Sequence, residues 1–114
     1  MRKESSTNAY NAQRIHARCG MAYTLSLIAG RWKPAILWQL LAEGKRYTEL
    51  VKSIPGASER MLIAQLRELE KDGLIKRSVF AEVPVRITYE LTDLGFSMKF
   101  LLQNLSDWGD QHRG

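Results

Sequence analysis

Residues 58–91 constrain the fold of this chain more than any other segment does. They read SERMLIAQLRELEKD, then Gly73, then two runs rich in strand-forming residues, LIKRSVFA and VRITYEL. Ser58 is suited to begin a helix because its hydroxyl can accept a hydrogen bond from an otherwise unpaired amide. Apolar residues then recur at spacings of four and three, which predicts one buried stripe formed by Leu62, Leu66 and Leu69. The segment therefore predicts a capped amphipathic helix over 58–72, followed at once by a β-hairpin.

A short helix and a tight turn precede this segment. Residues 48–53 predict the helix, and residues 54–57, with the sequence IPGA, predict the turn, since proline stops a helix and glycine permits an unusual backbone angle. Two helices joined by a tight turn and followed by a β-ribbon form a winged helix-turn-helix, whose second helix enters a DNA major groove. We therefore expect an α+β, mainly helical fold with a β-hairpin wing, and binding to double-stranded DNA.

The 114 residues suffice for one compact domain. We expect residues 1–18 to form a flexible or loosely docked arm and residues 19–114 to form the winged helix-turn-helix domain. The other elements expected in this domain are helices at 20–30 and 34–43, a short strand at 45–47 and a C-terminal helix at about 93–111. The helix at 34–43 carries four apolar residues on one stripe, Ile36, Leu37, Leu40 and Leu41.

Charge and composition narrow the class of protein only slightly. The net charge is +5, with the basic excess in the first half of the chain, and many proteins without a nucleic-acid role are as basic. No run approaches the ~20 apolar residues that span a bilayer, and the polar N-terminus lacks the apolar segment of a signal peptide. We therefore expect a cytoplasmic protein with no membrane partner.

The face of the 58–72 helix opposite its leucines is basic. Arg60, Ala64, Arg67 and Lys71 follow one another at spacings of four, three and four, and Glu68 and Glu70 lie toward the flanks. This face suits a DNA groove, and the small Ala64 allows close approach, although a solvated helix face has the same pattern. At the hairpin, Arg86 follows the tip and can enter a minor groove; the alternative is a surface arginine paired with Glu82.

The C-terminal helix has apolar residues on two faces. One stripe comprises Leu94, Met98, Leu101, Leu105 and Trp108, widened by Leu102, whereas Phe96 and Phe100 point almost the opposite way. Two apolar faces imply two neighbours, the helix's own domain and a second subunit. We therefore expect a homodimer whose interface includes Phe96, Phe100, Leu101, Leu105 and Trp108. The alternative is that the N-terminal arm covers the phenylalanines.

Three stretches together resemble the HxlR family of bacterial transcriptional regulators, relatives of the MarR group. They are CGMAYTLSLIAGRWKPAIL, RYTELVKSIPGASERMLIAQLRELEKDGLIKR and EVPVRITYELTDLGFSM, and the resemblance covers roughly Cys19 to His112. It implies a dimeric regulator with its recognition helix in the major groove. The residues that it implies for DNA contact are Ser58, Arg60, Ala64 and Arg67 on the helix, Arg86 on the wing, and Lys33 and Arg46 at phosphates. Gln65 departs from the family, which often has a basic residue there.

The single cysteine, Cys19, is a possible redox sensor, because a cysteine near this position responds to oxidants or electrophiles in several HxlR-like regulators. Arg14, His16 and Arg18 precede it, and positive neighbours raise thiol reactivity. The alternative is an inert thiol.

The sequence gives no indication of an enzyme. Its two histidines lie near opposite ends of the chain without companions at metal-ligand spacing, and no glycine-rich phosphate loop is present. We expect no metal and no cofactor. The three tryptophans are expected in the core rather than around a ligand. The functional alternative to DNA binding is a winged-helix module that binds an acidic protein.

Overall fold

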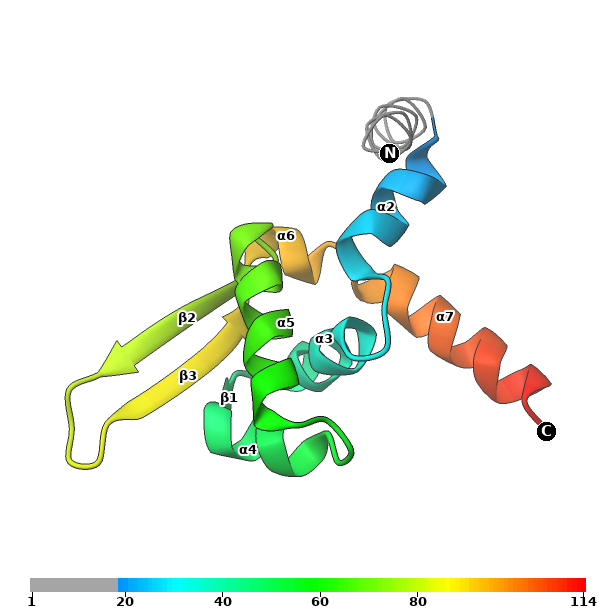
Figure 1. The fold of residues 1–114 in the computed structure, drawn as a ribbon. Helices are drawn as coiled ribbons and strands as arrows, with labels where there is room; N and C mark the ends of the chain where they lie inside the picture. Colours follow the sequence, from blue (N-terminus) through cyan, green and yellow to red (C-terminus); the bar gives the residue numbers. More distant parts are fainter. Residues whose placement is uncertain (1–18) are drawn as a thin grey trace, which may run out of the picture.

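A computed structural model describes residues 19–114 and shows a mainly helical fold with a small antiparallel sheet (Figure 1). The elements are α2 (Gly20–Ile28), α3 (Lys33–Ala42), β1 (Lys45–Arg46), α4 (Tyr47–Ser53), α5 (Glu59–Lys71), β2 (Ile75–Phe80), β3 (Arg86–Leu91), α6 (Asp93–Phe96) and α7 (Lys99–His112). This arrangement confirms the expected winged helix-turn-helix. The expected arm at 1–18 lies outside the described residues.

The local signals of the 58–91 segment operate as expected. The Ser58 hydroxyl accepts a hydrogen bond of 3.1 Å from the amide of Met61, which satisfies one of the unpaired donors at the start of α5. The helix ends before Gly73, whose φ of 77° is a left-handed conformation that glycine adopts without steric cost. Because both signals are local, the observed helix differs from the predicted 58–72 only by the two capping residues.

The core forms where α5 packs against α3. The predicted stripe of α5 is buried, as are three of the four apolar residues predicted on α3, while Leu41 is only partly buried. Leu50 of α4 and Ile75, Tyr89 and Leu91 of the sheet belong to the same core. Since burial of one leucine contributes about 1.5–3 kcal/mol, this cluster fixes the orientation of α5.

The sheet has the strand order β1-β3-β2, with both neighbouring pairs antiparallel. In the hairpin, Arg77 lies opposite Tyr89 and Val79 lies opposite Ile87, on the face that turns toward α5. The hairpin extends away from the helices as the wing, with its tip at residues 81–85 (Figure 1). Residues of α5 and of the wing strands line one pocket, so the wing lies beside α5.

The expectation of one continuous C-terminal helix over 93–111 is wrong. The segment is divided into α6 and α7 at Ser97 and Met98. Gly95 packs against the backbone carbonyl of Leu74, and the Thr92 side chain caps α6, so α6 is held against the start of β2. The turn at 97–98 then brings Met98 and Leu102 into the core.

This break changes which apolar residues are buried. Leu102 is the one residue of α7 that is buried. Of the stripe noted in the sequence, Met98 is buried, whereas Leu94, Leu101, Leu105 and Trp108 are on the surface. No helix among residues 19–114 is both long enough and apolar enough to cross a membrane.

We predict that Gly95→Ala destabilises the fold by about 1–3 kcal/mol, because the new methyl group would overlap the Leu74 carbonyl oxygen. Urea denaturation measures the change in the free energy of unfolding. Gly109→Ala is the matched control, since Gly109 lies in the last turns of α7 with nothing within 4 Å of its new Cβ, and it should be neutral or stabilising. Equal stabilities for the two variants would contradict the packing role of Gly95.

Candidate nucleic-acid interface

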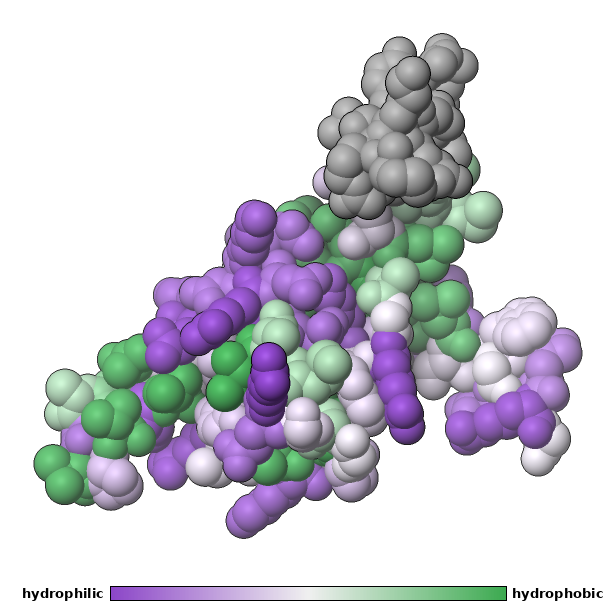
Figure 2. Space-filling view, in the orientation of Figure 1, coloured by the Kyte–Doolittle hydropathy of each residue, from purple (hydrophilic) through white to green (hydrophobic). Residues whose placement is uncertain are grey.

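The outer face of α5 is basic and exposed. Arg60, Ala64, Arg67 and Lys71 all lie on the surface, opposite the buried leucines. Hydrophilic side chains gather over the C-terminal end of α5 in Figure 2. Four residues at these spacings span three turns of helix, so they form one continuous ridge. A ridge of this kind can enter a major groove.

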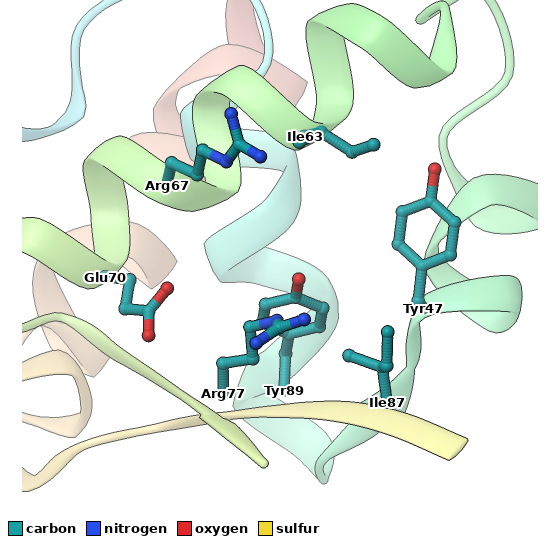
Figure 3. A pocket seen from close by; sticks show the side chains of 7 residues that line it. All are labelled: Tyr47, Ile63, Arg67, Glu70, Arg77, Ile87 and Tyr89. Atoms are coloured by element: carbon teal, nitrogen blue, oxygen red, sulfur yellow. The ribbon is translucent and has the colours of Figure 1, made fainter. Parts of the chain in front are cut away.

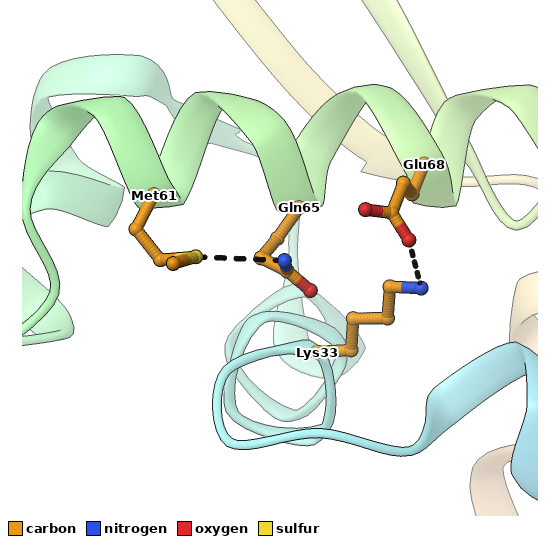
Figure 4. A network of polar contacts seen from close by, with 4 residues as sticks. All are labelled: Lys33, Met61, Gln65 and Glu68. Carbon is orange, nitrogen blue, oxygen red and sulfur yellow. Dashed lines mark hydrogen bonds and ion pairs between the residues drawn. The ribbon is translucent and has the colours of Figure 1, made fainter.

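Lys33 does not occupy the position expected for a phosphate contact. It is 6% exposed, and its ammonium lies 2.7 Å from the carboxylate of Glu68 on α5 (Figure 4). A buried lysine requires such a partner because an unpaired ammonium is costly to remove from water. The ion pair therefore links α3 to α5, and the expected role of Lys33 at DNA is wrong.

The same ion pair affects the charge of the candidate face. It holds the Glu68 carboxylate toward α3, on the flank of the helix, and Gln65 on that flank donates a hydrogen bond to the sulfur of Met61 (Figure 4). The ridge from Arg60 to Lys71 consequently has no carboxylate along its middle.

Ser58 and Arg46 lie at the edges of the face. Both are exposed, but the Ser58 hydroxyl is already occupied as the cap of α5. The backbone amide of Arg46 donates a 2.8 Å hydrogen bond to the carboxylate of Glu49, which anchors the start of α4. The Arg46 side chain borders a groove together with the wing tip.

Arg86 adopts the alternative arrangement considered from the sequence. Its guanidinium lies 2.9 Å from the carboxylate of Glu82 and 4.0 Å from the ring centroid of Phe80. The hydrogen bond from Arg86, together with the charges of Arg86 and Arg46, lowers the pKa of Glu82 against the opposing effect of burial. The Glu82 carboxylate is therefore ionised at neutral pH, and Arg86 is already paired in this structure.

Three residues of this surface were not identified from the sequence: Tyr47, Arg77 and Tyr89. Tyr47 donates a 2.7 Å hydrogen bond to Glu59 at the start of α5, and burial together with this carboxylate raises the pKa of Tyr47 to about 12. Arg77 and Tyr89 lie in a cleft of about 330 Å³ between α5 and the wing (Figure 3). Alternation along each strand shows which residues share a face with Arg77 on β2 or with Tyr89 on β3. Only the cross-strand register shows that these two residues share the face that α5 covers.

The residues expected at a dimer interface are exposed. The exposed fractions are 47% for Phe96, 76% for Phe100, 37% for Leu101, 50% for Leu105 and 65% for Trp108. Met21, Tyr23 and Leu25 of α2 are exposed as well, and Figure 2 shows hydrophobic surface around the junction of α2 and α7. Of the tryptophans expected in the core, only Trp32 packs against it, since Trp38 and Trp108 are on the surface.

Cys19 occupies the N-cap position of α2. Its thiol is unbridged and partly buried, and its backbone carbonyl accepts a 3.1 Å hydrogen bond from the amide of Tyr23. The basic residues expected to influence the thiol, Arg14, His16 and Arg18, lie outside the described residues.

The fold and this face define the class of protein, a helix-turn-helix regulator of transcription with a β-hairpin wing. The chain belongs to the HxlR-like helix-turn-helix family, whose profile matches residues 27–114. It is 39% identical over 95 residues to the HTH-type transcriptional regulator YdeP of Bacillus subtilis, covering 83% of this chain and 74% of YdeP. It is 43% identical over 91 residues to YkvN of the same organism, covering 80% of this chain and 77% of YkvN. The family and these relatives are regulators, not enzymes.

Solved structures of a redox regulator and of a transcriptional regulator share the fold. The redox regulator HypR in its oxidised form superposes with a TM-score of 0.79 at 34% identity, covering 84% of this chain and 99% of HypR. The reduced form of the transcriptional regulator YodB from B. subtilis superposes with a TM-score of 0.72 at 34% identity, covering 83% of this chain and 93% of YodB.

Proposed function

We propose that this protein regulates transcription by binding a specific duplex DNA sequence as a homodimer. The observation that carries the proposal is the ridge Arg60–Ala64–Arg67 on α5, which is exposed, basic and presented by a helix whose other face is buried. Membership of a family of helix-turn-helix regulators supports the same function.

The residues of the ridge have different roles in this proposal. Arg60 and Arg67 contact base edges in the major groove, where arginine pairs with the two acceptors of guanine. Ala64, between them, lets the helix backbone approach the bases. Arg46 contacts a phosphate, and Arg86 does so by exchanging the Glu82 carboxylate for a phosphate oxygen.

We predict that Arg67→Ala weakens binding to the selected operator and relaxes base preference at one position per half-site, since one arginine–guanine pair supplies about 1–3 kcal/mol of discrimination. Fluorescence anisotropy on operator and random duplexes at several salt concentrations measures both effects. Arg113→Gln is the control, because this exposed arginine at the C-terminal end of α7 lies away from α5 (Figure 1), and its loss should leave the salt slope unchanged. Equal losses on both duplexes for Arg67→Ala would contradict base recognition. If the protein binds neither duplex in a salt-sensitive way, the alternative function, a winged-helix module that binds an acidic protein, would be favoured.

The dimer proposal rests on the packing of α7. This helix has 14 residues, yet a single one of them is buried within the described chain, and an isolated helix of this length is marginal in water. Leu101, Leu105 and Trp108 lie on one face of it and Phe100 points to another side, and all four are exposed; their burial against a second copy would stabilise both helices. Two recognition helices in one dimer suit an operator with two half-sites.

We predict that Phe100→Glu converts the dimer to a monomer at micromolar concentration, because it places a charge in the apolar interface. Sedimentation velocity measures the mass. Val83→Glu at the wing tip is the matched control, since this fully exposed valine receives the same charge far from α7 (Figure 1), and it should remain dimeric. An unchanged mass for Phe100→Glu would count against this interface.

We also propose that oxidants or electrophiles control DNA binding through Cys19. The support is the structural likeness to HypR and YodB, one named a redox regulator and the other solved in a diamide-treated form. With one cysteine per chain, the modified state is an intersubunit disulfide, a small-thiol adduct or an electrophile adduct.

We predict that diamide or a quinone releases the wild-type protein from its operator and has no effect on Cys19→Ser, which lacks the only thiol. Gel shift of both proteins before and after treatment, with dithiothreitol to reverse a disulfide, provides the measurement. Release of Cys19→Ser by the same reagents would rule out the cysteine as the sensor.

A further inference from the structure

The cleft between α5 and the wing contains a polar group that the fold leaves without a partner. Tyr89 is 6% exposed as a residue, and its hydroxyl makes no hydrogen bond to another residue of the described chain and opens into the cleft (Figure 3). The hydroxyl oxygen itself stays accessible to water, because no buried side-chain oxygen of the described chain lacks a hydrogen bond. It is therefore free to donate a hydrogen bond to a group that enters the cleft.

Two arginines converge on the same cleft. Arg77 is the cross-strand neighbour of Tyr89, and Arg67 reaches the cleft from α5 (Figure 3). Within residues 19–114 neither guanidinium forms an ion pair, although Glu70 also lines the cleft. Two guanidiniums and one carboxylate leave one net positive charge.

The walls of the cleft strengthen this charge. Ile63 on α5 and Ile87 on β3 line it with apolar side chains, and the Tyr47 hydroxyl beside them is already occupied by Glu59. Apolar walls reduce local screening, so a bond between a guanidinium and an anion is stronger here than on an open surface.

We propose that this cleft binds an oxyanion, held by Arg77 and the Tyr89 hydroxyl from the sheet, while Arg67 on α5 adds positive charge at its edge and keeps its contact with a base. This proposal rests on the proposed function, because the oxyanion that we expect in the cleft is a phosphate of the DNA backbone. That phosphate would lie between α5 and the wing. A free phosphate ion has the same chemistry and is the other possible source.

The first arm of the test measures DNA affinity of the full chain on the selected operator over a range of salt. Arg77→Gln should weaken binding about tenfold and reduce the salt slope by about 0.9, as expected for one lost phosphate contact. Tyr89→Phe should weaken binding about threefold with an unchanged slope, because it removes a neutral donor. Lys76→Gln is the matched control, since Lys76 is the adjacent residue of β2 and points to the other face of the sheet.

Two further readouts separate binding from folding. Tyr89→Phe should unfold at the same temperature as the wild type or higher, because it removes a hydroxyl without a partner, whereas a hydroxyl needed by the fold would give a lower temperature. Glu70→Gln should tighten DNA binding, because it removes the one negative charge of the cleft. Weaker binding by Glu70→Gln would contradict an oxyanion beside this carboxylate, and would overturn the proposal.

The second arm titrates inorganic phosphate against chloride at constant ionic strength without DNA, followed by NMR shifts of residues around the cleft. Shifts that disappear in Arg77→Gln, with DNA affinity unchanged in that variant, would support the oxyanion site and assign it to a free anion. Losses of DNA affinity in Arg77→Gln and Tyr89→Phe assign it to the backbone phosphate. If neither arm responds to these variants, the proposal is wrong. If the wild type binds no duplex at all, the proposed function is wrong. The titration with inorganic phosphate then decides alone whether the cleft binds an oxyanion.

Discussion

Burial of the leucine stripe of α5 against α3 is the interaction on which the rest of this structure depends. Leu62, Leu66 and Leu69 are almost completely inaccessible, and truncation of one such residue to alanine typically costs about 2–5 kcal/mol. An exposed ion pair contributes about 1 kcal/mol or less. The apolar stripe, rather than any charge pair, therefore decides which face of α5 points outward, and by doing so presents Arg60 and Arg67.

Charged groups then refine an orientation that the core has already determined. The buried ammonium of Lys33 forms an ion pair with the carboxylate of Glu68, so this acidic residue of α5 is held on a flank of the basic ridge. At the wing, Glu82 forms an ion pair with Arg86. Arg67 and Arg77 line the cleft without a carboxylate partner in the described chain, so unpaired positive charge lies between α5 and the wing.

The parts of this structure that the sequence predicted are those determined by neighbouring residues. The cap at Ser58, the stop at Gly73 and the spacing of the leucines specify α5 locally, and strand alternation specifies the hairpin. The errors involve contacts between distant residues. Lys33 is paired with a residue 35 positions away, and the break after α6 depends on the contact of Gly95 with Leu74. The cleft depends on a cross-strand register and on a helix above it, neither of which periodicity reveals.

Selection of genomic fragments followed by dimethyl sulfate footprinting can show whether the outer face of α5 binds a major groove in each half of a dimer. This reagent methylates guanine at its major-groove nitrogen, which the arginines of α5 would cover. We expect two protected segments related by two-fold symmetry, with centres about 10 base pairs apart or a multiple of that spacing. Failure to enrich any fragment, or enrichment without protection of guanine in the major groove, would contradict this mode of binding.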